Sequence, residues 1–320
     1  MPFKSILAYV DTRHLPPDSE LQPCLASLAR LALAHEARLT LCDVIEPPPL
    51  PLHNGAPDAR LNALRVRHAR EELTRLAGQL GEPAWADRVV LQGNEFVQIT
   101  RHCMHHDVDL VVCLTGRQAG SRQLATARHL VRKAPAAVWL MGGRHRCQRN
   151  HIAVAVDRDI FPSSDFPQRM AHHLVEAAVA LARGETATIE LVHAWEVYGA
   201  DFIQDAELGL DAREVADYID AQRYSHTLWL EEIHEYLRQC VQGEARGRIQ
   251  TQARLLEGPA IEILPRWLSS ADPDVLVIGT LGTSATPGLF IGNTAETVLG
   301  CTDLAVLALK PPGFRSPVER

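Results

Sequence analysis

The 320-residue sequence lacks the apolar run of about 18 residues that a membrane-spanning helix needs. Its first residues, MPFKSILAYVD, hold one lysine and a short apolar run that ends at Asp11. A secretory signal has a longer apolar region and a small-residue cleavage site. These two absences lead us to expect a cytoplasmic protein without a membrane partner.

The seven cysteines lack the patterns of cross-linked or zinc-binding domains. They are scattered, their number is odd, and no two form a Cys-x-x-Cys motif. Most lie in apolar segments, where cysteine behaves as a small apolar residue. We therefore expect neither a disulfide framework nor a structural zinc site.

An excess of positive charge is also missing, since the formal net charge is -7. A general nucleic-acid binder needs a basic face to neutralise phosphates, so nucleic acid is not expected as a partner. Hydrophobic residues make up 46% and charged residues 22%, the balance of a soluble globular protein. The length suits two domains.

No motif of a common catalytic centre is present. The sequence contains no GxSxG, no GxxxxGK[ST] and no HExxH. The sequence therefore leaves open whether the protein is an enzyme.

What the sequence does contain is an internal repeat. Asp109 lies 16 positions after Gly93, and Asp274 lies 16 positions after Gly258. In each copy the glycine follows one apolar run and the aspartate begins another. Equal spacing across a strand-helix-strand unit indicates that the chain is duplicated.

Each copy contains five short apolar runs separated by helical patterns. The runs are continuously apolar, as in strands covered on both faces, and their alternation with helices predicts doubly wound parallel sheets of the α/β class. We expect the strands of the two five-stranded sheets near residues 3–10, 38–45, 86–91, 109–114 and 136–141, and near 151–156, 188–195, 249–256, 274–279 and 304–309.

The basic stretch 142–150 has no apolar pattern, and we interpret it as a linker. This places one domain at 1–143 and a second at 150–313. The second contains a longer insertion, 197–247, whose apolar stripe we expect to pack on the sheet. That stripe comprises Trp229, Ile233, Tyr236, Leu237, Cys240 and Val241.

The sharpest motif is a set of three glycines in the second copy. Two residues separate Gly279 from Gly282, and nine separate Gly282 from Gly292. The first glycine ends an expected strand and the last opens an expected helix, at the edge where open α/β sheets bind ligands. Glycine lets backbone N–H groups approach an anion, and a helix start favours negative charge.

This G-2x-G-9x-G spacing, with the duplication and the Gly258-Pro259 pair, resembles the universal stress protein family, and in particular its tandem members. The resemblance implies a stress-response protein with ATP, ADP or AMP bound in the second domain as a regulatory ligand. Mg²⁺ is expected only with the nucleotide. The last strands, near Val138 and Val306, are expected to pair as an internal pseudo-dimer, and a further homodimer is left open.

The family's nucleotide-binding positions transfer to eight residues. Asp157 matches an acidic residue near the nucleotide, and Ala194 matches a small residue near adenine. Ile278 and Gly279 would line the ribose and phosphate side. The phosphates would contact the remaining four, Gly282, Gly292, Asn293 and Thr294.

Two departures keep alternatives open. Family members that bind nucleotide usually have Ser or Thr where Asn293 stands, and the first copy lacks the glycine spacing. One alternative is an interaction protein of the same fold, in which the glycines only shape a turn. Another is a slow ATP hydrolase.

Two polar clusters remain. His102 and His106 lie four positions apart on an expected helix, so both could bind one metal ion. The helix dipole also favours histidine near a helix C-terminus without any metal. Asp157, Asp159 and Asp165 follow a strand and suit either Mg²⁺ beside a nucleotide or turn and cap chemistry.

Overall fold

The computed structural model describes residues 3–47, 56–80, 86–114, 121–141, 147–158, 166–199, 211–244, 248–280, 292–301 and 304–319. Within these residues the chain forms two halves of repeated strands and helices, as the sequence predicts. The strands begin and end within two residues of their expected limits.

The first half alternates strands and helices from the N-terminus. Its elements are β1 (Ser5–Tyr9), α1 (Asp18–His35), β2 (Arg38–Ile45), α2 (Ala56–Gln79), β3 (Ala86–Gln92), α3 (Glu95–His105), β4 (Leu110–Leu114), α4 (Ser121–Lys133) and β5 (Ala137–Met141).

The second half repeats this order. Its elements are β6 (His151–Ala155), α5 (Phe166–Ala182), β7 (Ala187–Trp195), α7 (Ala212–Glu244), β8 (Ile249–Glu257), α8 (Ala260–Ala271), β9 (Val275–Gly279), α9 (Asn293–Cys301) and β10 (Ala305–Leu309). None of the helices that the structure describes is both long and apolar enough to cross a bilayer.

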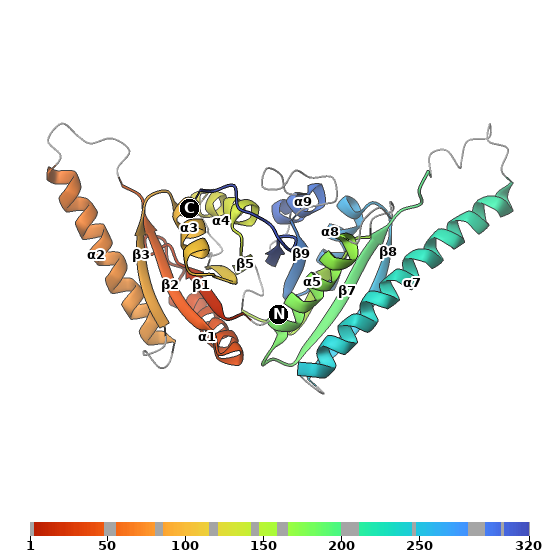
Figure 1. Cartoon of the computed structure of the whole chain (residues 1–320), viewed down its shortest axis with the longest axis horizontal. Helices are drawn as coiled ribbons and strands as arrows, with labels where there is room; N and C mark the ends of the chain where they lie inside the picture. The colour runs from red at the N-terminus through yellow and green to blue at the C-terminus, as the bar shows by residue number, and fades with distance from the viewer. Residues whose placement is uncertain are drawn as a thin grey trace.

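The two halves share one ten-stranded sheet of order β3-β2-β1-β4-β5-β10-β9-β6-β7-β8. Strands are parallel within each half, and β5 pairs with β10 antiparallel, with Leu307 opposite Trp139. Figure 1 shows the result, with α2 and α7 at the two outer ends. The last strands therefore join the halves, as expected for an internal pseudo-dimer.

The repeated glycine and aspartate have matching roles in the two halves. The Gly93 N–H donates to Ile45 O, and the Gly258 N–H donates to Trp195 O. Asp109 Oδ2 accepts from the backbone N–H groups of Lys4 and Ser5, which begin β1. Asp274 Oδ2 accepts in the same way from Asn150 and His151, at the start of β6. The equal spacing in sequence thus reflects one unit used twice.

The long helix α7 packs along the outer part of the second half-sheet. Ile233, Leu237 and Val241 are buried, and Trp229, Tyr236 and Cys240 pack against the same core. The stripe predicted for the insertion is therefore confirmed as core packing.

The halves also meet through α1 and α5. His35 Nδ1 accepts from the Phe3 N–H, and its Nε2 lies 2.8 Å from Ala180 O, to which it donates. Arg149 is buried and donates to Leu181 O at 2.6 Å, while its guanidinium pairs with Glu185. The contact between His35 and Ala180 thus joins the two helices, and Arg149 holds the segment before β6 to the end of α5.

Replacing Gly258 tests whether the repeated unit needs a glycine at this position. Its φ is +129°, where a side chain is strained, although an added Cβ meets only Ile263 Cβ at 3.8 Å. We expect Gly258→Ala to lower the free energy of unfolding by about 1–3 kcal/mol through backbone strain alone. Urea denaturation measures the change.

Gly78→Ala is the matched control, because that glycine lies in α2 and an added Cβ meets no atom within 4 Å. Since alanine favours helix over glycine, this control should be neutral or slightly stabilising. If Gly258→Ala unfolds at the wild-type urea concentration, the assigned backbone strain is wrong.

Candidate functional site

The second half-sheet reverses its strand order between β6 and β9. The chain runs outward from β6 through β7 to β8, then returns to place β9 on the other side of β6. Ala155 of β6 lies opposite Ile278 of β9, so both strands end at the same edge. In open α/β sheets ligands bind outside the carboxyl ends of strands at such a point.

A backbone hydrogen bond fixes the start of α9 at this edge. The Gly292 N–H donates to Thr280 O at 3.0 Å, and Thr280 is itself held by its N–H and hydroxyl to Leu309 O. Residues 280 and 292 are therefore neighbours, and α9 begins beside the end of β9. Gly282 lies outside the described residues.

The residues after Gly292 carry the backbone N–H groups that begin α9. The N–H groups in the first turn of a helix have no partner within the helix. Asn293 is exposed and Thr294 is half-buried. Because the Gly292 N–H is already donated to Thr280, Gly292 positions the helix start, and Asn293 and Thr294 offer their own N–H groups.

Gly279 has a packing role at the end of β9. A Cβ at this position would lie 3.0 Å from Met170 Cε of α5, closer than side chains normally approach. Glycine at 279 thus gives Met170 room, although Met170 Cε is the end of a flexible side chain and a small shift of it would accommodate a Cβ.

The two remaining predicted residues lie near the ends of β6 and β7. Asp157 follows β6 by two residues and is exposed, and Ala194 lies near the end of β7 and is half-buried. The Val156 N–H donates to Val192 O, which holds the chain leading to Asp157 beside β7. The seven described residues of the predicted set therefore lie at or near the carboxyl ends of β6, β7 and β9 and at the start of α9.

Sequence reasoning missed a buried histidine pair below this edge. His193 Nδ1 lies 3.1 Å from Val156 O, and His193 Nε2 lies 2.8 Å from His226 Nδ1 of α7. Because a carbonyl only accepts, His193 carries its proton on Nδ1, and its Nε2 accepts from His226. The two residues are 33 positions apart, so no local pattern marked them as partners.

Both histidines of this pair stay neutral at ordinary pH. Burial is the main reason that the pKa of His193 falls to about 4, and the nearby His226 and Arg158 lower it further. Burial and Arg158 also lower the pKa of His226. Arg158 directly follows Asp157 and donates to Ser225 Oγ of α7 at 2.9 Å. Arg158 therefore holds the chain after β6 to α7.

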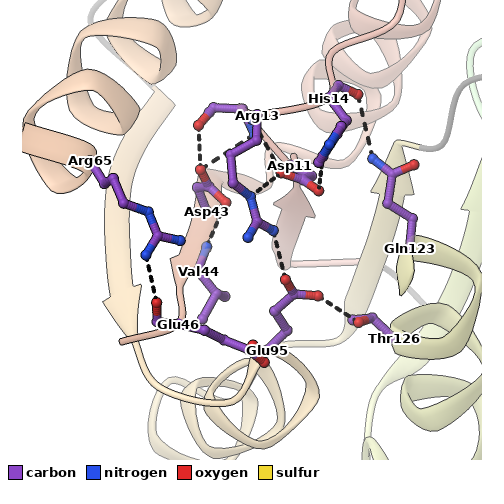
Figure 2. Close-up of polar contacts among 11 residues, drawn as sticks. Asp11, Arg13, His14, Asp43, Val44, Glu46, Arg65, Glu95, Gln123 and Thr126 are labelled. Atoms are coloured by element: carbon purple, nitrogen blue, oxygen red, sulfur yellow. Dashed lines mark hydrogen bonds and ion pairs between the residues drawn. The ribbon is translucent and has the colours of Figure 1, made fainter. Parts of the chain in front are cut away.

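The corresponding edge of the first half is filled by the protein's own charges (Figure 2). The Arg13 guanidinium donates to Asp11 at 2.7 Å and to Glu95 at 2.7 Å. The other Glu95 oxygen accepts from the Thr126 hydroxyl. Although burial alone would raise the pKa of Asp11, hydrogen bonds from Arg13 and His14 hold it below its ordinary value.

Asp43 adds a further buried carboxyl to this first-half cluster. It accepts from the Thr12 hydroxyl and from the N–H groups of Thr12 and Val44. Burial raises the pKa of Asp43, and the proximity of Asp11 adds to that rise. Asp11 therefore serves an internal network of polar contacts.

The histidines at the end of α3 lie together. The His102 and His106 rings are 4.2 Å apart, and burial lowers the pKa of His102 to about 4. In the part of the chain that the structure describes, no three His, Cys, Asp or Glu side chains are grouped to hold a metal ion. Asp159 and Asp165 lie outside that part.

The low pKa of His193 predicts a loss of stability in acid. As the pH falls below 6.5 the unfolded chain protonates this histidine, whereas the folded chain does so only near pH 4. The free energy of unfolding should therefore fall by about 3 kcal/mol across this range on account of His193. Denaturation curves at several pH values measure it.

His193→Gln keeps a donor and an acceptor but does not titrate, so its acid loss should be smaller by that amount. His105→Gln replaces an exposed histidine of α3 and should retain the wild-type profile. Parallel pH profiles for wild type and His193→Gln would show that His193 is not the group responsible.

Comparison with known proteins places this geometry in a family. The model of the Universal stress protein family matches the chain twice, over residues 2–141 and 149–310. Universal stress protein E of Escherichia coli (strain K12) is 24% identical over 192 residues, covering 60% of this chain and 56% of that protein. The match thus spans just over half of that relative's length.

A second relative and two solved structures agree. The Universal stress protein E homolog of Haemophilus influenzae is 23% identical over 226 residues, covering 70% of this chain and 69% of that protein. A universal stress protein from Archaeoglobus fulgidus DSM 4304 has a TM-score of 0.62 at 13% identity, covering 99% of both chains. A functionally unknown protein from Pseudomonas aeruginosa PAO1 has a TM-score of 0.57 at 21% identity, covering 97% of this chain and 93% of that one.

A universal stress protein solved in complex with cAMP is also similar, with a TM-score of 0.33 and 20% identity over 49% of this chain and 95% of that one. The solved structures with the higher TM-scores confirm the fold. The double match of the family model, which covers nearly the whole sequence, shows that this chain belongs to the Universal stress protein family in tandem form.

Proposed function

We propose that this protein acts in the stress response and binds an adenine nucleotide (ATP, ADP or AMP) in its second half as a regulatory ligand. The nucleotide would lie across the ends of β6 and β9, with its phosphates at the start of α9. Family membership and the glycine spacing support the ligand class. We also propose that the protein acts in the cytoplasm.

The hydrogen bond from Gly292 to Thr280 is the observation on which this proposal depends most. It brings the first turn of α9 to the end of β9, within the same edge as Asp157. A helix start offers N–H donors and a positive dipole end to phosphate oxygens. Asn293 and Thr294 supply those donors.

Neighbouring charges favour an anion at the same place. Glu296, in the first turn of α9, is paired with Arg132 of α4 at 2.8 Å, which offsets its negative charge. Mg²⁺ would arrive with the nucleotide, since this ion is commonly held by one or two carboxylates and phosphate oxygens.

The two halves are proposed to differ in this function. At the edge of the first half, Arg13 already pairs with Asp11 and Glu95. A nucleotide there would have to displace these ion pairs from a buried cluster. We therefore propose one nucleotide per chain.

One of the two alternatives follows from a particular observation. The alternative of an interaction protein is supported by exposed Tyr218, Tyr224 and Leu228 of α7, which suit a protein surface that meets partners. The alternative of slow ATP hydrolysis has no observation of its own, and phosphate release above the buffer rate would be needed to support it.

Calorimetric titration tests the proposed site. We expect saturable binding of ATP, ADP or AMP with one site per chain. Binding by Gly292→Val should be at least tenfold weaker, because a valine side chain obstructs the approach of phosphates to the backbone N–H groups. cAMP is titrated alongside. Gly300→Ala is the control, since an added Cβ there meets no atom within 4 Å.

Binding that is equal in Gly292→Val and wild type would place the ligand elsewhere on the chain. An absence of heat at millimolar concentrations of every nucleotide, with the protein folded by circular dichroism, would favour the interaction protein.

Asn293 provides a second prediction, because it stands where family members that bind nucleotide usually have Ser or Thr. Its longer side chain occupies space at the start of α9, so Asn293→Ser should tighten ATP binding severalfold. The same titration measures the change. Weaker binding in Asn293→Ser would instead assign the asparagine amide a direct role in holding the phosphates.

A further inference from the structure

Two cysteines from distant parts of the sequence lie side by side where the halves join. Cys24 belongs to α1, and Cys147 belongs to the segment that leads into β6. Their sulfur atoms are 3.1 Å apart, although 123 positions separate them in the sequence. A disulfide bond is about 2.04 Å long, so the two sulfurs need to approach by only about 1 Å to be joined.

The surroundings hold this pair in place. Cys24 is buried in the helix and Cys147 is partly buried and packs against the same core cluster. Two residues after Cys147, the buried Arg149 donates to Leu181 O and pairs with Glu185 of the second half. Glu185 also accepts from Arg30 of α1 at 3.1 Å. Glu185 thus links the chain after Cys147 to α1, the helix that contains Cys24.

Three other cysteines are poor candidates for oxidation. Cys42, Cys103 and Cys113 are buried in the sheet and in α3, and burial raises the pKa of each thiol, to about 12 for Cys103 and Cys113. A thiol reacts with an oxidant as its thiolate, so these residues should stay reduced. Partial exposure distinguishes Cys147 from them.

We propose that Cys24 and Cys147 are a redox-modifiable pair that forms a reversible disulfide when the protein meets a peroxide. The Cys147 thiolate attacks hydrogen peroxide, breaks its O–O bond and becomes a sulfenic acid, and the displaced hydroxide takes up a proton to leave as water. The Cys24 sulfur then attacks the sulfenic sulfur and expels a second water. Two thiols lose two electrons and two protons, and one peroxide becomes two waters.

The bond would tie α1 of the first half to the segment that enters β6 of the second. Reduction by a dithiol reverses it. The pair would form one reversible bond, which differs from the structural disulfide framework that the cysteine spacing argues against. The inference goes beyond nucleotide binding and does not depend on it.

Peptide mapping tests the pair directly on the full chain. The protein is treated with hydrogen peroxide, its remaining thiols are blocked with iodoacetamide, and it is digested without reductant. We expect a cross-linked peptide that contains Cys24 and Cys147 and is lighter by two hydrogen atoms than the sum of its parts. Dithiothreitol before alkylation should restore both thiols. The melting temperature should rise by roughly 5 °C on oxidation.

Cys147→Ser should abolish both the cross-linked peptide and the rise in melting temperature. Cys240→Ser changes another partly buried cysteine, on α7, and should leave both intact. Recovery of Cys24 and Cys147 from peroxide-treated wild type as separate alkylated, sulfinic or sulfonic peptides would overturn the proposal. So would cross-linking of Cys147 to a different cysteine.

Discussion

The antiparallel pairing of β5 with β10 is the constraint on which the rest of this structure depends. Each half ends in a strand that is apolar along most or all of its length, and in isolation that strand would leave unpaired backbone groups at a sheet edge. Pairing the two edges covers both strands and turns two half-sheets into one. It also brings α4 of the first half to α9 of the second, where Arg132 meets Glu296.

Much of this arrangement could be predicted from the sequence, because the repeated elements follow local rules. Apolar strands and helical stripes appear as runs and periodicities. The spacing of Gly93 and Asp109, repeated by Gly258 and Asp274, reflects backbone contacts that both halves need. At the candidate site the strand ends and the start of α9 were predictable for the same reason.

The contacts that set the halves apart were not predictable. Arg13 pairs with Glu95 across 82 positions, and His193 with His226 across 33. Cys24 meets Cys147 only because the sheet is continuous and α1 lies beside the segment before β6. Such pairs arise from tertiary packing, and a single sequence contains no periodic signal for them. They show that the two halves share one framework but differ at the carboxyl ends of their strands.

The edge formed by the carboxyl ends of the strands therefore has different chemistry in the two halves. The first-half edge satisfies its carboxylates internally, with Arg13 between Asp11 and Glu95. The second-half edge keeps an exposed Asp157 and an exposed Asn293 at the start of a helix. Because of this difference, we expect only the second edge to bind a nucleotide. Amide hydrogen exchange with and without ATP tests it most directly. We expect slower exchange at Asn293, Thr294 and the residues around Asp157, with no change at 11–14. Slower exchange around Arg13, or none in the second half at saturating ATP, would contradict it.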